Sequence, residues 1–549
     1  MSCTKSWLFF NKSYTVNRMA EKENGEEQDD VVSKSIGEYG LWQLQMTMIL
    51  ALVNIPCTWH IVSFTFQAAD HNVWCVRNDN FRNITSLNNF TQSTDHCFIK
   101  NITDPSVHSD VSVLQDQNYS LIKCDKWEFE GRGDTLIKDF NLLCDREHLI
   151  NVADMTFLAG VAFGGLVGGI FSDKYGRKRM LICAIFLQAL LGTLIAVTPW
   201  FELYVVLRTI LGFISVSVVF SGFVLTVELV GGKWRIVSGV SYMFPVALSY
   251  ILISGIAWLL PYWRHLQFAI SLPGFLFVGL WWVLPESPLW LLAMGRTQEV
   301  LQILRSAAKR NKRQLPDNLD KQLLTEPEMQ TEKASVLDLF RTARMRRTTF
   351  LLCTIWFSLY LLYYGIVLNL GNIGGDLYVN TVISGAVEAP AIAISIPILL
   401  RMGRRWPLCL TMLITGISCL LTLPMPYIFN KQWIVTTLAM IGKFSISSTN
   451  AIVPIFTAEL YPTTIRNIGV GANNVSAGIA LILVPFLWDL KYVHATVPMA
   501  LLGACGLMGG LTVLFLPETS NLPLDATIKQ QKSGRRMSCT RKVHKRVSA

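Results

Sequence analysis

Two ionisable residues interrupt apolar stretches in the second half of the chain. Glu388 lies in the apolar run 379–400, and Lys443 lies in the run 434–458. A charge inside a membrane-crossing helix costs about 2.5 to 3.5 kcal/mol on insertion scales, so each residue is a candidate for a functional site. Glu388 could attract an ammonium group, and Lys443 could attract a carboxylate. The alternative is that the two pair with each other and hold their helices together.

Aromatic side chains follow one face of a neighbouring apolar run, 348–370. Trp356, Tyr360, Tyr363 and Tyr364 recur at helical spacing. An aromatic ring can bind an organic ammonium through a cation–π interaction of about 0.5 to 2 kcal/mol. Ordinary helix packing or an interfacial aromatic belt is the alternative. We take Trp356, Tyr360 and Tyr363, with Glu388 and Lys443, as the candidate binding residues for a small charged organic molecule.

A second set of charges recurs at the ends of apolar runs. Glu228-Leu229 and Glu459-Leu460 are each followed by an arginine at the same spacing. The pairs Gly-Arg and Pro-Glu also occur once in each half of the chain, and nearly the same number of residues separates the two copies of each feature. Charges at helix ends can pair in one state of a moving bundle and separate in another. The alternative is that they only mark the membrane interface. The candidate gate residues are Asp173, Arg177, Glu228, Arg235, Glu459 and Arg466.

The elements that must position these residues are membrane-spanning helices. Apolar and aromatic residues make up 51% of the 549 residues, whereas only 16% are Asp, Glu, Lys or Arg, below the share of about 25% in soluble domains. Stretches long enough to cross about 30 Å of hydrocarbon occur roughly a dozen times. The predicted spans are 42–66, 148–170, 180–198, 203–228, 237–260, 266–284, 348–370, 379–400, 406–426, 434–458, 467–488 and 494–516.

The basic residues set the expected orientation. Lys and Arg crowd the loops 173–179, 285–347 and 401–405, whereas the loops 199–202 and 371–378 carry none. Because basic residues near span ends stay on the cytosolic side, we expect both termini in the cytosol. The net charge of +10 is then explained by topology, and nucleic-acid binding is disfavoured because no aromatic residues interleave with the basic runs.

The long polar insertion 67–147 is expected outside the cell. It holds four sequons, which predict glycosylation at Asn83, Asn89, Asn101 and Asn118. It also holds an even set of cysteines, which predicts two disulfides in an oxidising compartment, with three pairings open. These cysteines are Cys75, Cys97, Cys124 and Cys144.

The repeated features divide the chain into two six-helix halves, an arrangement in which one half rocks against the other to give alternating access. The predicted fold is all-α and membrane-integral. The predicted boundaries are a tail 1–38, a first half 39–284 that includes the loop 67–147, an inter-half loop 285–347, a second half 348–518 and a basic tail 519–549.

Several motifs resemble those of a known group. Gly169 to Lys178 looks like the loop signature of the major facilitator superfamily. The glycosylated first loop and a set of further motifs resemble the organic cation, anion and carnitine transporter family. These are Asn141-Leu142-Leu143-Cys144, Trp263-Arg264, Val387-Glu388-Ala389-Pro390 and Ala458-Glu459-Leu460-Tyr461-Pro462. The resemblance runs from about residue 38 to 525.

The resemblance implies a major facilitator fold of twelve helices and transport of small organic ions across the plasma membrane. It implies disulfides joining Cys75 to Cys124 and Cys97 to Cys144. Trp356, Tyr363, Glu388 and Lys443 match family positions. Gly478 departs from the family, because it occupies a position where members handling cations tend to carry an acid and members handling anions a base.

We expect a transporter of organic cations or zwitterionic amines, with the lipid bilayer as its other partner, no cofactor or metal, and an unknown coupling ion. An organic anion carrier centred on Lys443 and a transport-inactive receptor or accessory subunit are the alternatives. An enzyme is disfavoured because the sequence holds no GxSxG or P-loop motif. His60 is expected to line the cavity, and Arg208 to pack against helix carbonyls.

Overall fold

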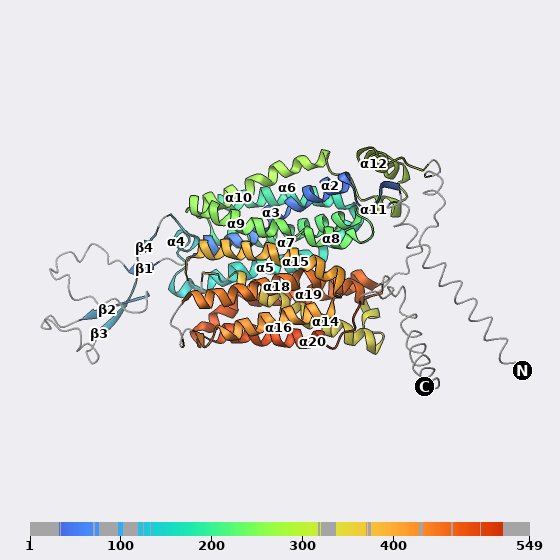
Figure 1. The fold of residues 1–549 in the computed structure, drawn as a ribbon. Helices are drawn as coiled ribbons and strands as arrows, with labels where there is room; N and C mark the ends of the chain where they lie inside the picture. Colours follow the sequence, from blue (N-terminus) through green and yellow to red (C-terminus); the bar gives the residue numbers. More distant parts are fainter. Residues whose placement is uncertain are drawn as a thin grey trace, which may run out of the picture.

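The molecule is a bundle of long, nearly parallel helices with a small strand region at one end (Figure 1). The structure is a computed structural model. It describes residues 32, 35–69, 72–75, 97–102, 119–124, 126–131, 133–316, 319, 336–368, 370–371, 375–425, 428, 432–462, 465–494 and 496–519.

The first half contains the helices drawn from blue to green in Figure 1. They are α2 (Leu41–Leu52), α3 (Asn54–Gln67), α4 (Leu136–Asp139), α5 (His148–Tyr175), α6 (Arg177–Ala196), α7 (Phe201–Glu228), α8 (Trp234–Ser241), α9 (Phe244–Leu259) and α10 (Trp263–Phe277), with the 3-10 helices η2 (Cys144–Arg146) and η3 (Val278–Trp282). Two further helices, α11 (Pro288–Ala293) and α12 (Thr297–Arg310), lie in the predicted inter-half loop.

The second half contains the helices drawn mostly in orange and red below the first half in Figure 1. They are α14 (Ala343–Val367), α15 (Leu377–Arg401), α16 (Arg405–Leu421), α18 (Gln432–Leu460), α19 (Arg466–Leu487) and α20 (Val497–Val513), with the 3-10 helices η4 (Val336–Leu339) and η6 (Trp488–Tyr492).

Within the described residues, nine helical segments are long and apolar enough to cross a membrane. Several join two elements, as α2 with α3 and α8 with α9 do. The bent helix at Cys144–Tyr175 is a tenth such segment if its two parts are counted as one span. Two shorter apolar helices, Arg405–Leu421 and Val497–Val513, lie at two further predicted spans. The arrangement is consistent with twelve helices, and the all-helical membrane fold predicted from the sequence is confirmed.

Two antiparallel strand pairs form beyond one end of the bundle (Figure 1). Strand β1 (Asn72–Cys75) pairs with β4 (Trp127–Glu130), and β2 (Phe98–Ile102) pairs with β3 (Tyr119–Lys123). Disulfides join Cys75 to Cys124 and Cys97 to Cys144, with Cα–Cα distances of 5.8 and 5.5 Å. We call this the loop end of the bundle, and the opposite end, which carries α11 and α12, the basic end.

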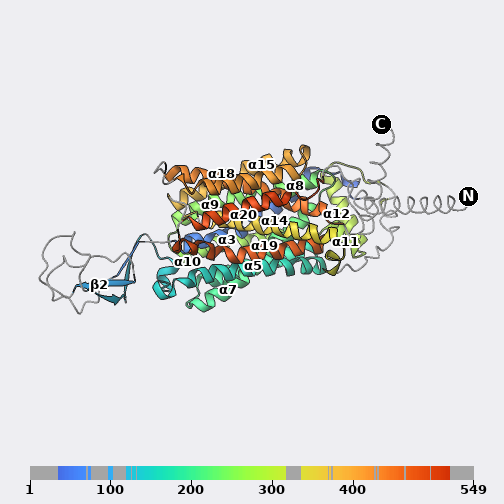
Figure 2. The same ribbon diagram turned by 90° about the horizontal axis from the view of Figure 1, so that it is seen from below.

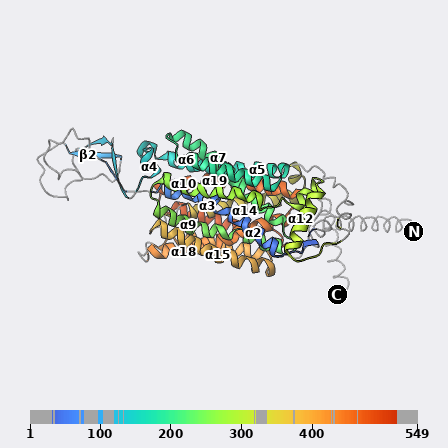
Figure 3. The ribbon, with the colours of Figure 1, turned by 90° about the horizontal axis from the view of Figure 1, so that it is seen from above.

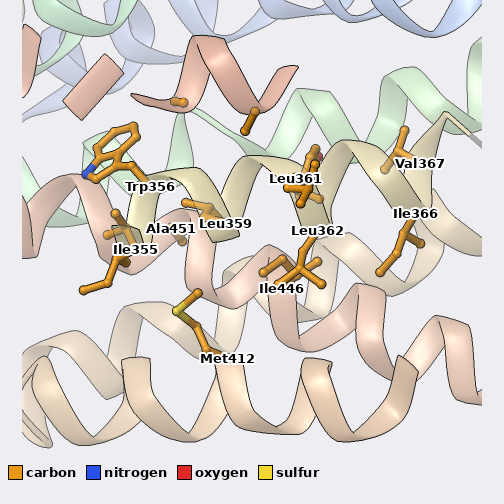
Figure 4. Close-up of a cluster of buried hydrophobic side chains, with 14 of the residues drawn as sticks. Ile355, Trp356, Leu359, Leu361, Leu362, Ile366, Val367, Met412, Ile446 and Ala451 are labelled. Atoms are coloured by element: carbon orange, nitrogen blue, oxygen red, sulfur yellow. The ribbon is translucent and has the colours of Figure 1, made fainter. Parts of the chain in front are cut away.

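The core of the second half surrounds α14. Its apolar side chains from Ile355 to Val367 meet Met412 of α16 and Ile446 and Ala451 of α18 (Figure 4). These side chains are buried, so α14 is held on several sides. The packing fixes the rotation of the helix that carries Trp356, Tyr360 and Tyr363.

The two halves meet along two seams on opposite sides of the bundle. The views from below and above place α5 beside α19 on one side and α9 beside α15 on the other (Figures 2 and 3). A Cβ on Gly478 would lie 2.6 Å from the Cβ of Ala162, and a Cβ on Gly385 would lie 2.6 Å from the carbonyl oxygen of Ala247. Glycine is therefore required where the seams are tightest.

The glycines of α5 and α19 nearer the basic end have free space beside them. Gly169 lies on the same face of α5 as Ala162, two turns nearer the basic end, and Gly471 lies likewise two turns from Gly478 on α19. A Cβ on Gly169 or Gly471 would meet no described atom within 4 Å. On this seam the close contact is at mid-height, whereas on the other seam α8 of the first half contacts α15 of the second.

The loop end is closed by contacts between the halves. The Asn151 amide donates to the Asp489 carboxylate at 2.6 Å, and Ser254 donates to the Tyr378 carbonyl at 2.8 Å. The rings of Phe66 and Tyr378 pack with centroids 5.5 Å apart. The described contacts therefore close the loop end of the bundle.

Candidate functional site

Glu388 and Lys443 form an ion pair between α15 and α18. Lys443 Nζ lies 3.0 Å from Glu388 Oε2, and the two side chains are 0% and 3% exposed, respectively. Tyr363 of α14 donates its hydroxyl to Glu388 Oε1 at 2.7 Å. The alternative in which these two charges pair with each other is therefore the arrangement that the structure contains.

The Lys443 ammonium group is surrounded by aromatic rings. Lys443 Nζ lies 3.6 Å from the centre of the Tyr363 ring and 5.2 Å from that of Tyr250. The hydroxyls of Tyr250 and Tyr363 are 3.4 Å apart. Tyr250 belongs to α9, so the first half completes a site otherwise built by the second. Sequence reasoning missed Tyr250, because a lone tyrosine in an apolar run gives no local signal.

The remaining aromatic candidates continue from this site along α14. Trp356 stacks on Tyr360 with ring centroids 5.7 Å apart, and Tyr360 packs on Tyr364 at 5.8 Å. The Trp356 indole donates to Thr457 Oγ1 of α18 at 2.9 Å. The predicted aromatic face therefore exists as a continuous row, which ends at the Glu388–Lys443 pair through the edge contact of Tyr363 and Tyr364.

The helix backbone beside the pair is interrupted. Pro390 follows Glu388 inside α15 and removes one helical hydrogen bond. Ser448 of α18 donates to the Ala391 carbonyl at 3.3 Å, which ties the two helices together next to the pair. Ser384 and Ser447 lie one turn from Glu388 and Lys443, and their buried hydroxyls have no hydrogen-bond partner among the described residues. Both are further candidates for contacts with a ligand.

The predicted gate residues form one cluster in each half. Arg177 of α6 contacts Glu228 at 3.1 and 3.2 Å and Asp173 at 2.8 Å. In the second half Arg404 contacts Glu459 at 3.0 and 3.2 Å. Sequence reasoning missed Arg404 as the partner of Glu459, although the repeated Gly-Arg pair marked its position.

The described ion pairs of Arg177 and Arg404 each join residues of one half. Arg235 donates to the Val230 carbonyl at 2.9 Å within the first half. Nε and Nη2 of Arg466 have no hydrogen-bond partner in the described part of the chain. Burial lowers the pKa of Arg466, and the negative charge of Glu459 opposes that shift.

Glu286 and Glu518 have equivalent positions beside the two clusters. Glu286 accepts a hydrogen bond from the Lys178 amide at 2.9 Å, and Glu518 accepts from the amides of Arg404 and Arg405 at 2.9 and 3.1 Å. A carboxylate at a helix N-terminus satisfies free amides and complements the helix dipole. The Pro-Glu repeat seen in the sequence thus anchors α6 and α16.

The predicted sites of the loop are only partly described. Asn101 lies on β2, whereas Asn83, Asn89 and Asn118 lie outside the described residues. No group of three or more His, Cys, Asp or Glu that could hold a metal ion occurs among the residues that the structure describes.

Comparison with known proteins decides the family. The model of the family described as sugar (and other) transporter matches residues 148–529, more than half of the chain. The chain is 34% identical to an organic cation transporter protein of Drosophila melanogaster, covering 91% of this chain and 94% of that one. It is 32% identical to human solute carrier family 22 member 13, covering 92% and 93%.

The chain belongs to the solute carrier family 22 group of the major facilitator superfamily.

Solved structures agree on the fold of this family 22 protein. The proton:xylose symporter XylE, a major facilitator protein, matches with a TM-score of 0.61 at 15% identity, covering 88% of this chain and 98% of that one. A partially occluded, inward-open conformation of XylE from E. coli gives the same TM-score. At this identity the likeness concerns the fold alone. The family membership supports a multi-pass membrane transporter of organic ions.

Proposed function

We propose that this protein moves small organic ions across the plasma membrane by alternating access, with zwitterionic or cationic amines as substrates. The observation that carries the proposal is the position of the Lys443 ammonium, held by the Glu388 carboxylate and the Tyr363 ring. These are the two groups that would bind an organic ammonium. The lysine thus occupies the place that a substrate amine would take.

The pair favours a zwitterion over a singly charged ion. Separating two buried, paired charges costs several kcal/mol unless each finds a new partner. A zwitterion such as a betaine gives its ammonium to Glu388 and its carboxylate to Lys443, so both charges remain paired. An organic cation satisfies Glu388 alone, and an organic anion satisfies Lys443 alone.

The proposed orientation has the loop end outside the cell and both termini in the cytosol. The strand region with its disulfides lies at the loop end, and disulfides persist in oxidising compartments. The basic end carries Arg177, Arg404 and the basic helix α12. Basic residues at that end fit the cytosolic face.

Uptake into a low-background cell line tests the proposal. The probes are labelled carnitine as the zwitterion, tetraethylammonium as the cation and glutarate as the dicarboxylate, and the variants are Glu388→Gln, Lys443→Gln and both together. We expect carnitine uptake by the wild type and its loss in each single variant at equal surface expression. Lys443→Gln should raise cation uptake, because Glu388 is released from its internal partner.

Other outcomes would favour the alternatives. Glutarate uptake that Lys443→Gln abolishes and Glu388→Gln spares would replace the proposal with an anion carrier. Binding of a probe without flux into sealed vesicles would favour a receptor. Glu202→Gln is the matched control, since Glu202 is exposed at the loop end of α7 and contacts neither charge of the pair among the described residues.

A further inference from the structure

The first half contains a second buried charge pair, which the proposed mechanism does not use. Asp154 of α5 and Arg208 of α7 are nine-tenths or more buried, and their nearest charged atoms, Oδ1 and Nη2, are 3.6 Å apart. That distance is longer than a hydrogen bond. His60 of α3 and Tyr204 of α7 are equally buried, and both lie close enough to Arg208 to interact electrostatically with its guanidinium.

Arg208 is held by rings rather than by the helix carbonyls expected from the sequence. Its guanidinium carbon lies 4.5 Å from the centre of the Phe64 ring and 4.6 Å from that of Phe157. Stacking on two rings fixes the guanidinium plane but satisfies none of its N–H groups. Nε and Nη2 of Arg208 have no hydrogen-bond partner among the described residues.

The other polar atoms of this cluster are equally unsatisfied. Asp154 Oδ1, His60 Nδ1 and the Tyr204 hydroxyl lack hydrogen-bond partners in the described part of the chain. Buried polar groups are normally hydrogen-bonded, and an incompletely solvated buried carboxylate is costly. Taking up a proton removes that charge and its desolvation cost.

Asp154 is the carboxylate beside Arg208, and the groups around it decide how a proton there would be held. The described titratable or charged side chains in the cluster are Arg208 and Tyr204 from α7 and His60 from α3, and α14 adds Tyr360 and Tyr364 to the same apolar cluster. Arginine stays protonated under all ordinary conditions. Leu481 of α19 carries no charge, whereas α4 and α10 add the ion pair of Asp139 with Arg264 beside Trp263.

The cluster adjoins the contact that closes the loop end. Asp154 lies one turn after Asn151 on α5, and Asn151 donates to Asp489 of the second half at 2.6 Å. Leu481 of α19 and Tyr360 and Tyr364 of α14 bring the second half to the same apolar cluster. A change of charge at Asp154 would therefore alter the electrostatic environment of the contact between the halves.

We propose that Asp154, held between Arg208 and His60, is a proton-binding site whose occupancy changes during transport. At the loop end the Asp154 carboxylate takes one proton from water and becomes a carboxylic acid, which ends its attraction to Arg208. When the basic end is open, the proton leaves to that side and the ion pair forms again. One proton then crosses with each cycle. Proton binding itself does not depend on the proposed function, whereas its coupling to substrate does.

Infrared difference titration of the purified full-length protein tests proton binding directly. The protonated carboxyl gives a C=O stretch that appears as pH falls, and Asp154→Asn should remove it. Asp154→Glu should restore a shifted band, and Glu202→Gln, an exposed carboxyl on the neighbouring helix α7, should leave the Asp154 band in place. A band unchanged in a folded Asp154→Asn protein would overturn the proposal.

Uptake of labelled carnitine into proteoliposomes tests the coupling. Below the titration midpoint uptake should level off, and above it uptake should fall about tenfold per pH unit, as the protonated fraction of one site does. Asp154→Asn should lose this slope, and Asp154→Glu should retain it. Persistence of the slope in Asp154→Asn would overturn the coupling. Absence of carnitine uptake in the wild type, with the infrared band present, would contradict the proposed function and leave the proton site standing.

Discussion

The Tyr363 hydroxyl and the Tyr363 ring hold different members of the buried pair. The hydroxyl donates to Glu388, and the ring face receives the Lys443 ammonium. The two contributions are separable because phenylalanine keeps the ring and leucine keeps neither. Among the sequence-predicted candidates, Tyr363 is therefore the residue whose chemistry can be dissected most cleanly.

Tyr363→Phe should weaken carnitine binding by about 1 kcal/mol, roughly fivefold, through the lost hydrogen bond to the carboxylate. Tyr363→Leu should lose a further contribution of about 0.5 to 2 kcal/mol from the ring. The measurement is the concentration dependence of uptake for the two variants at matched surface expression, with Tyr378→Phe as a control, since Tyr378 packs at the loop end. Equal effects of the Phe and Leu substitutions would mean that the ring face contributes nothing.

At the level of elements, the seam between α5 and α19 depends on two small residues. A Cβ on Gly478 would come within 2.6 Å of Ala162, whereas a Cβ on Gly471, on the same face two turns away, would meet nothing described within 4 Å. The departure from the family at Gly478 thus has a packing consequence, because a side chain there would press the halves apart.

Gly478→Ala should lower uptake and reduce the melting temperature of the purified protein, because overpacking a close contact costs about 1 to 3 kcal/mol. Ala162→Gly in the same protein should restore both, since it removes the opposing methyl group. Gly471→Ala is the matched control for the melting temperature, which it should leave unchanged or raise, as alanine favours a helix by up to about 1 kcal/mol over glycine. A loss in Gly471→Ala as large as that in Gly478→Ala would contradict the seam argument.

The elements were predicted from the sequence far more completely than their contacts. Long apolar runs report directly on membrane-crossing helices, and α14, α15 and α18 match their predicted spans within a few residues. Glu388 and Lys443 were visible because charges are rare in such runs. Tyr250, Arg404 and the strand pairs were missed, because each depends on a partner far away in the chain. Neither the periodicity of apolar residues nor the amino-acid composition indicates such long-range contacts.

At the level of the whole molecule, alternating access requires the loop end to open when the basic end closes. The hydrogen bond between Asn151 and Asp489 joins the halves at the loop end. Gly169 of α5 and Gly471 of α19 lie toward the basic end, and a Cβ on either would meet no described atom within 4 Å. These two places should therefore behave in opposite ways during the cycle.

A cross-link between cysteines at positions 151 and 489 should stop uptake, and mild reduction should restore it. The pair Asn151→Cys and Asp489→Cys is compared with each single substitution, which should remain active under the same oxidant. A second pair, Gly169→Cys with Gly471→Cys, should cross-link only when the loop end opens. Full uptake by a protein completely cross-linked between 151 and 489 would rule out opening at that end.

Glu388 and Lys443 belong to the same half, and their charges sum to zero. When the empty protein reorients, this pair carries no net charge through the electric field of the membrane, in which each elementary charge is worth about 2.3 kcal/mol per 100 mV. A zwitterion adds none either, so its passage alone should be insensitive to voltage. Any inward current recorded during zwitterion uptake would therefore be carried by accompanying ions, and its loss in Asp154→Asn would identify them as protons borne by that residue.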